Sequence, residues 1–210
     1  MSTVTTEKKK RSRKLPKTIT EKQALEILGG INRKTISGCR HYAIIMTMYR
    51  SGLRVSEICN LTPADVNFET EMLFLQNAKG GKDRYVPIDE DTKVALESWN
   101  DIRPESRWFF CAYSHGKVGN QMSTRQVREM CYRTSENAHV YIQDGTEKKK
   151  VSPHKFRHTF ATEILNNSNF NLVELKDLLG HSSIATTQVY THVAMEEVKK
   201  KFQNRKPLAS

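Results

Sequence analysis

The stretch SPHKFRHTFATEILNN, residues Ser152–Asn167, has the pattern of a helix whose first turns carry positive charge. Ser152 is a favourable N-cap, and Pro153 suits the first helical position. The next two turns hold four basic side chains: His154, Lys155, Arg157 and His158. A helix N-terminus carries partial positive charge, so cations there cost stability unless an anion faces them. The basic first turns therefore predict that an anion lies in front of this helix.

One face of this helix is apolar, at about 100° per residue. It consists of Phe156, Phe160 and Ile164, and the solvent side holds Thr159, Thr162, Glu163 and Asn166. Arg157 lies at the edge of the apolar face with His154 and His158 beside it, so all three are expected to lean toward the protein. A phosphate against the helix N-terminus would satisfy both Arg157 and the free backbone N–H groups. The alternative is a core histidine with a surface arginine.

Composition indicates a basic cytoplasmic protein with one domain. The chain has 210 residues, 37% of them hydrophobic, and a formal net charge of +11. Its longest apolar run, around Ala43–Met48, is too short to span a bilayer, and its first residues lack the apolar core of a signal peptide. Four dispersed cysteines without a CxxC pair fit reduced, buried thiols rather than a zinc ribbon or a disulfide framework: Cys39, Cys59, Cys111 and Cys131.

Much of the charge lies in the first 17 residues. They contain seven lysines or arginines and one glutamate, so they contribute +6 of the +11. We expect a disordered arm that lies along a polyanion such as a nucleic acid. A solubilising tail explains the same composition equally well.

The periodicity predicts a mainly α-helical protein with a small antiparallel β-sheet, an α+β fold. Helices are expected over 20–29, 35–50, 91–102, 123–138, 152–167 and 171–179, with a short one from about residue 54, a short one that holds Tyr190 and a last one from 195. A β-hairpin is expected around Gly80-Gly81 within Met72–Ile88, because two β-rich runs flank the glycines. Residues 108–111 read as a short strand, and IQDGTEKKK, residues 142–150, as a polar loop.

Three further stretches hold groups with chemical potential. In LLGHSSIATTQVYTHV, His181 falls in a turn after Gly180, and Tyr190 lies on the next short helix. A tyrosine is a poor nucleophile near neutral pH unless cations lower its pKa. GLRVSEICNL places Arg54 at a helix start, where the alternative role is an ion pair with Glu57. NAKGGKDR places lysines at a hairpin tip, either to donate a proton or simply as a solvated turn.

Taken together and in this order, the motifs GLRxSE, a lysine-bearing hairpin, HxxRH, LGH and a tyrosine nine residues later resemble the tyrosine recombinase, or phage integrase, family. The resemblance covers about Thr18–Gln203. Its longest runs are SGLRVSEICNLTPADV, VSPHKFRHTFAT and LLGHSSIATTQVYTHV. It implies the catalytic-domain fold of that family over 18–194, preceded by the basic arm 1–17 and followed by a C-terminal helix and tail, 195–210.

The resemblance also implies roles for individual residues. Arg54 and Arg157 match the arginines that clamp the scissile phosphate, and Tyr190 matches the nucleophile that forms a 3′-phosphotyrosine bond. Lys79 aligns best with the lysine that protonates the leaving 5′-oxygen, with Lys82 as the other candidate. His154 and His181 match histidines that assist proton transfer and bind the phosphate. Supporting roles fall to Glu57 and His158, and DNA contacts to Lys82, Arg84 and Lys155. Neither a metal nor another cofactor is implied.

As partners, the resemblance implies double-stranded DNA with inverted half-sites and a homotetramer on synapsed DNA, with a monomer when free. Accessory DNA-bending or excisionase proteins are further expected partners, and a membrane is not. The C-terminal helix, with a stripe at Met195, Val198 and Phe202, would dock on a neighbouring subunit or pack on its own domain. The core-binding domain usual in the family is not seen before residue 18, so we expect a compact recombinase or a shortened chain.

The resemblance favours DNA integration, excision or inversion over three other functions. A type IB topoisomerase shares the chemistry but fits the LGHSSIATTQVYTHV run less well. A non-catalytic DNA-binding regulator leaves the full set of chemical positions unexplained. An RNA-binding protein explains only the charge.

Overall fold

The computed structural model describes residues 17–78, 82–113, 116, 118–166, 170, 174, 178–180 and 193–208. The basic arm up to residue 16, Lys79, His181 and Tyr190 lie outside the described residues. Within them the helices are α1 (Glu21–Gly29), α2 (Ile36–Arg50), α3 (Val55–Asn60), α4 (Glu90–Asn100), α5 (Thr124–Asn137), α6 (Pro153–Asn166) and α8 (Val193–Gln203). The predicted mainly helical fold with small antiparallel sheets is confirmed.

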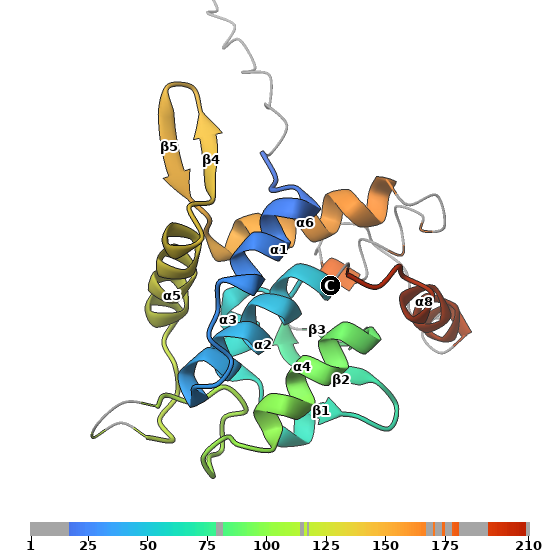
Figure 1. The fold of residues 1–210 in the computed structure, drawn as a ribbon. Coiled ribbons are helices and arrows are strands. Elements are labelled where there is room, and N and C mark those ends of the chain that lie inside the picture. Colours follow the sequence, from blue (N-terminus) through green and yellow to red (C-terminus); the bar gives the residue numbers. More distant parts are fainter. Residues whose placement is uncertain are drawn as a thin grey trace, which may run out of the picture.

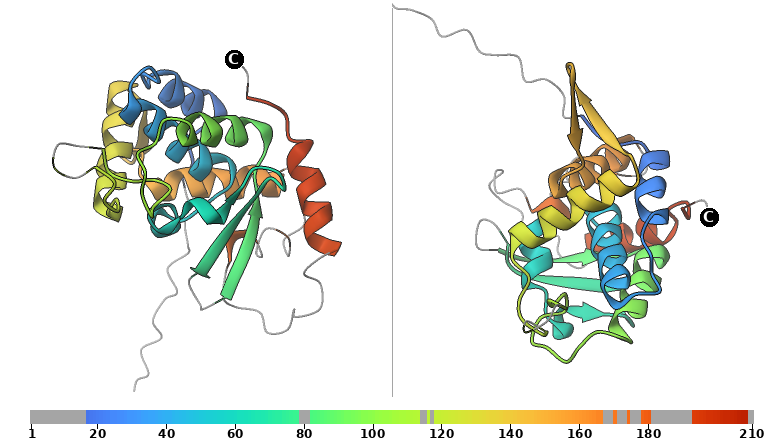
Figure 2. Two further views of the ribbon diagram at one scale, coloured as in Figure 1. Left: turned by 90° about the horizontal axis from the view of Figure 1, so that it is seen from below. Right: turned by 60° about the vertical axis from the view of Figure 1, so that its left-hand side comes forward.

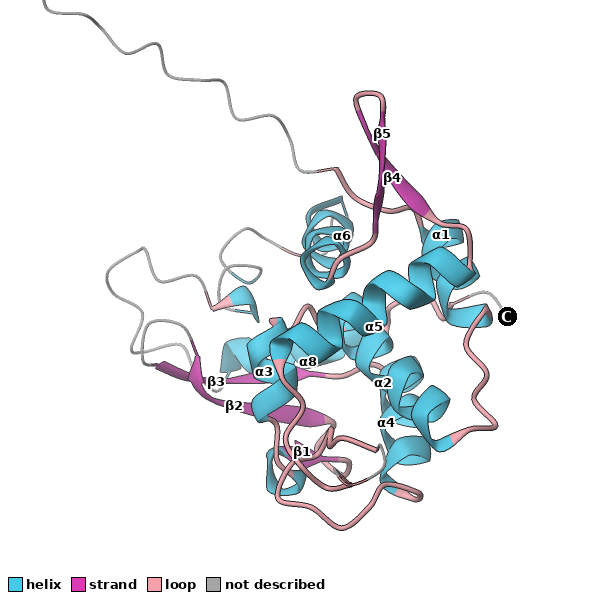
Figure 3. Cartoon of the chain, turned by 90° about the vertical axis from the view of Figure 1, so that its left-hand side faces the viewer, coloured by secondary structure: helices cyan, strands magenta, loops and turns pink. Residues whose placement is uncertain are grey.

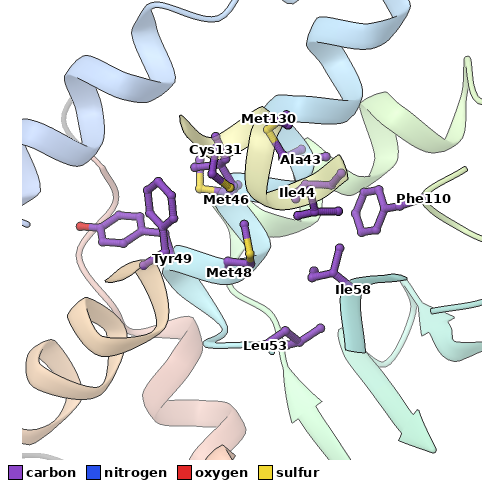
Figure 4. Close-up of a cluster of buried hydrophobic side chains, with 14 of the residues drawn as sticks. Ala43, Ile44, Met46, Met48, Tyr49, Leu53, Ile58, Phe110, Met130 and Cys131 are labelled. Atoms are coloured by element: carbon purple, nitrogen blue, oxygen red, sulfur yellow. The ribbon is translucent and has the colours of Figure 1, made fainter. Parts of the chain in front are cut away.

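Helix α2 is the centre of the fold, as Figure 1 shows, with α1 and α6 on one side and α4 on the other. Its YAIIMTMY run is apolar on most sides, and residues 43–49 are all buried. Figure 4 shows Met46, Met48 and Ile44 meeting Met130, Cys131, Phe110 and Ile58 from other elements. A helix that is buried all round must be covered by neighbours on every side, which fixes where α1, α4, α5 and α6 pack.

The predicted hairpin is also confirmed. Strands β1 (Val66–Asn67), β2 (Met72–Ala78) and β3 (Lys82–Pro87) form one antiparallel sheet in that order. Leu73 pairs with Val86 and Leu75 with Arg84, so these four side chains share the inward face. In Figure 2, β2 and β3 extend together as the longest strands of the molecule. Residues 79–81, which connect these two strands in the sequence, lie outside the described residues.

One predicted strand and one predicted loop were wrong. Residues 108–111 form bends rather than a strand, with a single bridge from Cys111 to Gln121. The expected polar loop is a second hairpin, β4 (Tyr141–Asp144) and β5 (Glu147–Lys150), which stands away from the body in Figures 1 and 3. Its two-residue turn is Gly145-Thr146, and the Asp-Gly dipeptide at its start is a strong hairpin signal. Its strands, however, are mostly exposed and lack the apolar alternation that predicts a strand.

Helix α8 packs on its own chain. Val198 and Phe202 are buried against Phe160, Ile164, Phe170, Leu178 and Leu179. Met195 lies in the helix, but its side chain is outside the described part. Of the two expected arrangements, docking on a neighbouring subunit or packing on the same domain, the structure therefore shows the second.

The tail after α8 is bound to the domain rather than free. Arg205 donates to the carbonyl of Arg50 and to Glu163 Oε2 (3.5 Å), and its guanidinium lies over the rings of Phe160 and Phe202. The backbone N–H of Leu208 donates to Asp91 Oδ2 at 3.0 Å. These contacts hold the end of the described chain against α2, α4 and α6. No helix in the described ranges is long and apolar enough to cross a membrane.

Gly52 controls the exit from α2. Its φ of +66° lies in the left-handed region, and an added Cβ would approach Phe160 Cδ1 to 2.3 Å. Phe160 is fully buried on α6, so the ring has no room to withdraw. A glycine is therefore required where α2 turns toward α3.

We expect Gly52→Ala to lower the free energy of unfolding by about 3 kcal/mol, from backbone strain and overpacking against Phe160. Urea unfolding followed by circular dichroism measures this change. Gly29→Ala is the matched control, because nothing lies within 4 Å of an added Cβ there and alanine favours the helix. Equal stability of the two variants would contradict the tight packing inferred at Gly52.

Candidate active site

A buried carboxylate, Glu57 on α3, organises the site. Its Oε2 accepts the backbone N–H of Arg54 at 2.7 Å, at the residue that precedes the helix. Its Oε1 accepts Nη1 of the same arginine at 2.7 Å. The expected pair of Arg54 and Glu57 is therefore present, but the Glu57 side chain is only 7% exposed, so it is not a surface ion pair. A buried carboxylate at the helix N-terminus also compensates the cation there.

Arg84 on β3 binds the same carboxylate. Its Nη1 donates to Oε1 at 2.8 Å and its Nη2 to Oε2 at 3.0 Å, in a bidentate arrangement. Its Nε donates to the carbonyl of Leu178 at 3.0 Å. We predicted a DNA contact for Arg84; in the protein without DNA this side chain is 9% exposed and faces Glu57.

Arg157 on α6 lies deeper than the sequence suggested, with 8% of the residue exposed. Its Nη1 donates to the carbonyl of Gly52 at 2.5 Å and its Nη2 to that of Leu179 at 2.6 Å. The anion that this helix seemed to require is thus partly replaced by backbone carbonyls. Figure 1 shows α6 beside α2, and the bond to Gly52 joins Arg157 to the turn between α2 and α3.

Three consecutive carbonyls gather the three arginines. Leu178 and Leu179 are helical, and Gly180, with a φ of +57°, ends that segment. Carbonyls at a helix C-terminus have no helical partner and carry partial negative charge. The pairs are Arg84 with Leu178, Arg157 with Leu179 and Arg54 with Gly180. Guanidiniums from a helix start, a strand and a helix interior thus meet at one helix end.

The close approach of these charges changes their ionisation. Burial, followed by the positive charge of Arg54, lowers the pKa of Arg157 to about 10, with Arg84 adding to the effect and Glu57 opposing it. Burial by itself would raise the pKa of Glu57, but the hydrogen bonds and charges of Arg84 and Arg54 hold that pKa below its ordinary value. The carboxylate is therefore ionised and the cluster keeps a net positive charge, which suits an anionic ligand.

The other predicted residues are placed as follows. His154 and His158 are exposed on α6 and do not lean into the protein, whereas Thr159, expected on the solvent side, is buried and accepts the N–H of Ile19 at 3.2 Å. Those orientations were wrong because the helix is rotated further toward Arg157 than the apolar face alone suggested. His158 therefore does not pack in the core.

Lys155 and Lys82 are the two lysines predicted to contact DNA, and the structure describes the side chain of Lys155 alone. Lys155 donates through Nζ to the carbonyl of Lys17 at 2.9 Å, at the root of the arm. Lys82 begins β3, and its side chain lies outside the described part. In the sequence, His181 follows directly on Gly180, whose carbonyl binds Arg54. Across the residues that the structure describes, no three His, Cys, Asp or Glu side chains gather as metal ligands would.

The sequence held one signal for the buried place of Arg84. It stands two residues before Val86 in β3, and alternate residues of a strand face the same side. Since Val86 is fully buried, that spacing places Arg84 on the inward face. An inward arginine requires a buried anion, and Glu57 is the one it meets.

We expect Glu57→Gln to lower the free energy of unfolding at pH 7 by about 3 kcal/mol, because the guanidiniums of Arg54 and Arg84 lose the carboxylate that they bind. Since folding depresses the pKa of Glu57, its stabilisation is present above the unfolded-state value of about 4.3 and is lost as the pH falls through the lower folded-state pKa. The variant should therefore lose less stability than the wild type between pH 5 and the acid limit of folding. Denaturant unfolding across this pH range tests both effects.

Glu147→Gln serves as the control, since that side chain is 71% exposed in the β4–β5 hairpin and should cost less than about 0.5 kcal/mol. If both variants had the same unfolding midpoint and the same acid limb, Glu57 would not be the ionic centre of the site.

Comparison with known proteins now supplements this geometry. The sequence model of the phage integrase family matches residues 17–197. Tyrosine recombinase XerA from Thermococcus kodakarensis is 32% identical over 196 residues, which cover 92% of this chain and 64% of the relative. The chain thus spans about three fifths of the length of curated relatives such as this one.

Solved structures agree. A crystal structure of XerA recombinase is 30% identical, with a TM-score of 0.66 over 92% of this chain and 68% of that one. A lambda integrase dimer bound to a core site is 17% identical, with a TM-score of 0.63 over 82% of this chain and 60% of that one, which shows a shared fold. The family model matches almost the full described length, from the root of the arm into α8. This chain therefore belongs to the phage integrase family.

Proposed function

We propose that this chain cuts and rejoins DNA as the catalytic part of a site-specific tyrosine recombinase. One observation carries the proposal: Arg54 and Arg157, which lie 103 positions apart in the sequence, converge on adjacent carbonyls beside one ionised carboxylate. A net positive, preorganised group of guanidiniums is the electrostatic arrangement that stabilises charge developing on a phosphoryl group. Such a site needs a phosphodiester as its ligand.

The guanidiniums retain donors for that phosphate. Each has five N–H groups, of which Arg54 and Arg157 each use two in the contacts described. The remaining N–H groups of the two arginines would bind the non-bridging oxygens of the scissile phosphate. Backbone carbonyls that occupy the other donors hold both guanidinium planes in orientation before DNA arrives.

The reaction itself is a transesterification. The phenol oxygen of Tyr190 forms a bond to phosphorus while the bond from phosphorus to the 5′-oxygen breaks, giving a 3′-phosphotyrosine and a free 5′-hydroxyl. The phenol proton passes to His154, and Lys79, or Lys82 in its place, gives a proton to the leaving 5′-oxygen. His181 binds the phosphate. A 5′-hydroxyl of another strand reverses the step, so no high-energy cofactor is consumed.

Outside the site, electrostatics would hold the DNA. The arm contributes +6, and Lys155 lies where its root meets α6. We infer modest affinity with a steep salt dependence, because contacts to phosphates release counterions. In the same proposal, the DNA carries inverted half-sites, and the protein is a monomer when free and a homotetramer on synapsed DNA. It works with accessory proteins in the cytoplasm. The proposal divides the chain into three parts with separate roles: the arm 1–17, the catalytic domain 18–194 and the C-terminal segment 195–210.

Covalent capture tests the proposal. A pool of nicked duplexes with a randomised centre is incubated with the protein, and adducts that survive SDS are isolated and sequenced. We expect an adduct with the wild type and none with Tyr190→Phe, while the exposed Tyr113→Phe serves as control and reacts normally. A shifted band without an adduct would instead indicate a regulator. Relaxation of generic supercoils without joining of defined sites would indicate a topoisomerase.

Replacement of one guanidinium provides a second test. We expect Arg157→Lys to slow adduct formation by about 10²–10³-fold, because lysine keeps the charge but loses the planar fork. The rate is measured in single turnover on the captured DNA, with circular dichroism to establish the fold. Arg33→Lys, whose arginine lies over the Tyr42 ring near the start of α2, is the control. A folded Arg157→Lys variant with the wild-type rate would contradict the phosphate role.

A further inference from the structure

We propose that Arg84 is a positioning residue that holds Glu57 and the helix end Leu178–Gly180 together, so that Arg54 is correctly placed for the phosphate. The inference rests on the proposed function for its effect on cleavage. The contacts that carry it belong to the protein without DNA. They give Arg84 a place distinct from both the phosphate clamp and the DNA surface.

The first support is the completeness of its contacts. Each of the three nitrogens of Arg84 donates within this assembly, two to Glu57 and one to the Leu178 carbonyl. The side chain is 9% exposed, so its charge interacts mainly with groups of the protein and little with solvent. By contrast, Arg54 reaches Glu57 with one side-chain nitrogen and is 17% exposed.

The second support is the fit at Gly180. An added Cβ there would lie 2.8 Å from Arg84 Nη1 and 3.1 Å from its Cζ. The guanidinium therefore crosses directly over the residue that ends this helical segment, at a φ of +57° that also favours glycine. Strand β3 and the helix end are thus in direct contact through one side chain.

The third support is the sharing of Glu57. Arg54 and Arg84 bind the same Oε1, at 2.7 and 2.8 Å, and the two arginines also bind carbonyls of the same helix end. Loss of Arg84 would leave Glu57 held from one side and the Leu178 carbonyl without this donor. Arg54, which depends on both Glu57 and Gly180 for its orientation, would then be free to shift. A shift of about 1 Å near reacting atoms can cost about 10²-fold in rate.

Electrostatics give this role a distinct signature. The charged groups that face Glu57 are Arg54 at the start of α3, Arg84 from β3 and Arg157 from α6. The hydrogen bonds and charge of Arg84 are the main cause that lowers the pKa of Glu57 against its burial. Without Arg84 that pKa rises, so Glu57 becomes protonated at a higher pH and releases Arg54 there. A residue with only a structural role would not move this pH dependence.

The first experiment needs no DNA. Hydrogen exchange of the Leu178–Gly180 region is measured in the wild type, Arg84→Met, Arg84→Lys and the control Arg33→Lys. We expect exchange there to rise about tenfold in Arg84→Met, since one charge-assisted hydrogen bond and the ionic contact to Glu57 are lost, with α2 unchanged. If the methionine variant does not fold, Arg84→Lys, which keeps the buried charge, gives the same comparison. Wild-type exchange in a folded variant would overturn the proposal.

The second experiment uses the captured DNA. We expect Arg84→Lys, which cannot form the bidentate pair, to form the adduct about 10²-fold more slowly with an unchanged Kd. In Arg84→Met, which also removes the charge beside Glu57, we expect the acidic limb of the pH–rate profile to move to higher pH. A loss of affinity at full cleavage rate, or an unmoved acidic limb, would overturn the positioning role. Should the wild type form no adduct, the proposed function fails, while hydrogen exchange still decides whether Arg84 holds the helix end.

Discussion

The site depends on one constraint: guanidiniums gathered away from solvent need hydrogen-bond acceptors and a counter-charge from the protein itself before any anionic ligand is present. Glu57 supplies the counter-charge, and the carbonyls of Gly52, Leu178, Leu179 and Gly180 supply further acceptors. Mutual repulsion among three arginines would otherwise drive them apart. Because the acceptors come from a helix end and a helix start, the cluster exists only when distant elements are packed, so folding and assembly of the site are the same event.

The core explains how those elements are brought together. Gly52 turns the chain sharply after the buried helix α2, its carbonyl binds Arg157, and its missing side chain makes room for Phe160. Phe160 in turn packs against Phe202 of α8, and Arg205 lies over both rings. The C-terminal segment is therefore connected to the arginine cluster through a single layer of aromatic packing. A rearrangement of α8 would therefore alter the packing next to the arginine cluster.

The sequence predicted the elements whose signals are local. Capping residues and apolar periodicity gave α1, α2, α4 and α5 within about two residues, and the glycine pair gave the β2–β3 hairpin. It failed where the signal was weak or nonlocal. The β4–β5 strands are mostly exposed and carry no alternation, and the bends at 107–110 are held by contacts such as Phe109 N–H to the Leu61 carbonyl.

For the site, the sequence by itself determined which residues are present, their order, and the family pattern that names Arg54, Glu57 and Arg157. Only the tertiary structure decided how they are used. It buried Arg84 against Glu57, turned His154 and His158 outward, and packed α8 on its own domain. The reason is physical: periodicity reports the face on which a side chain lies, whereas the partner of a buried charge depends on which distant element supplies the opposite charge or a free carbonyl.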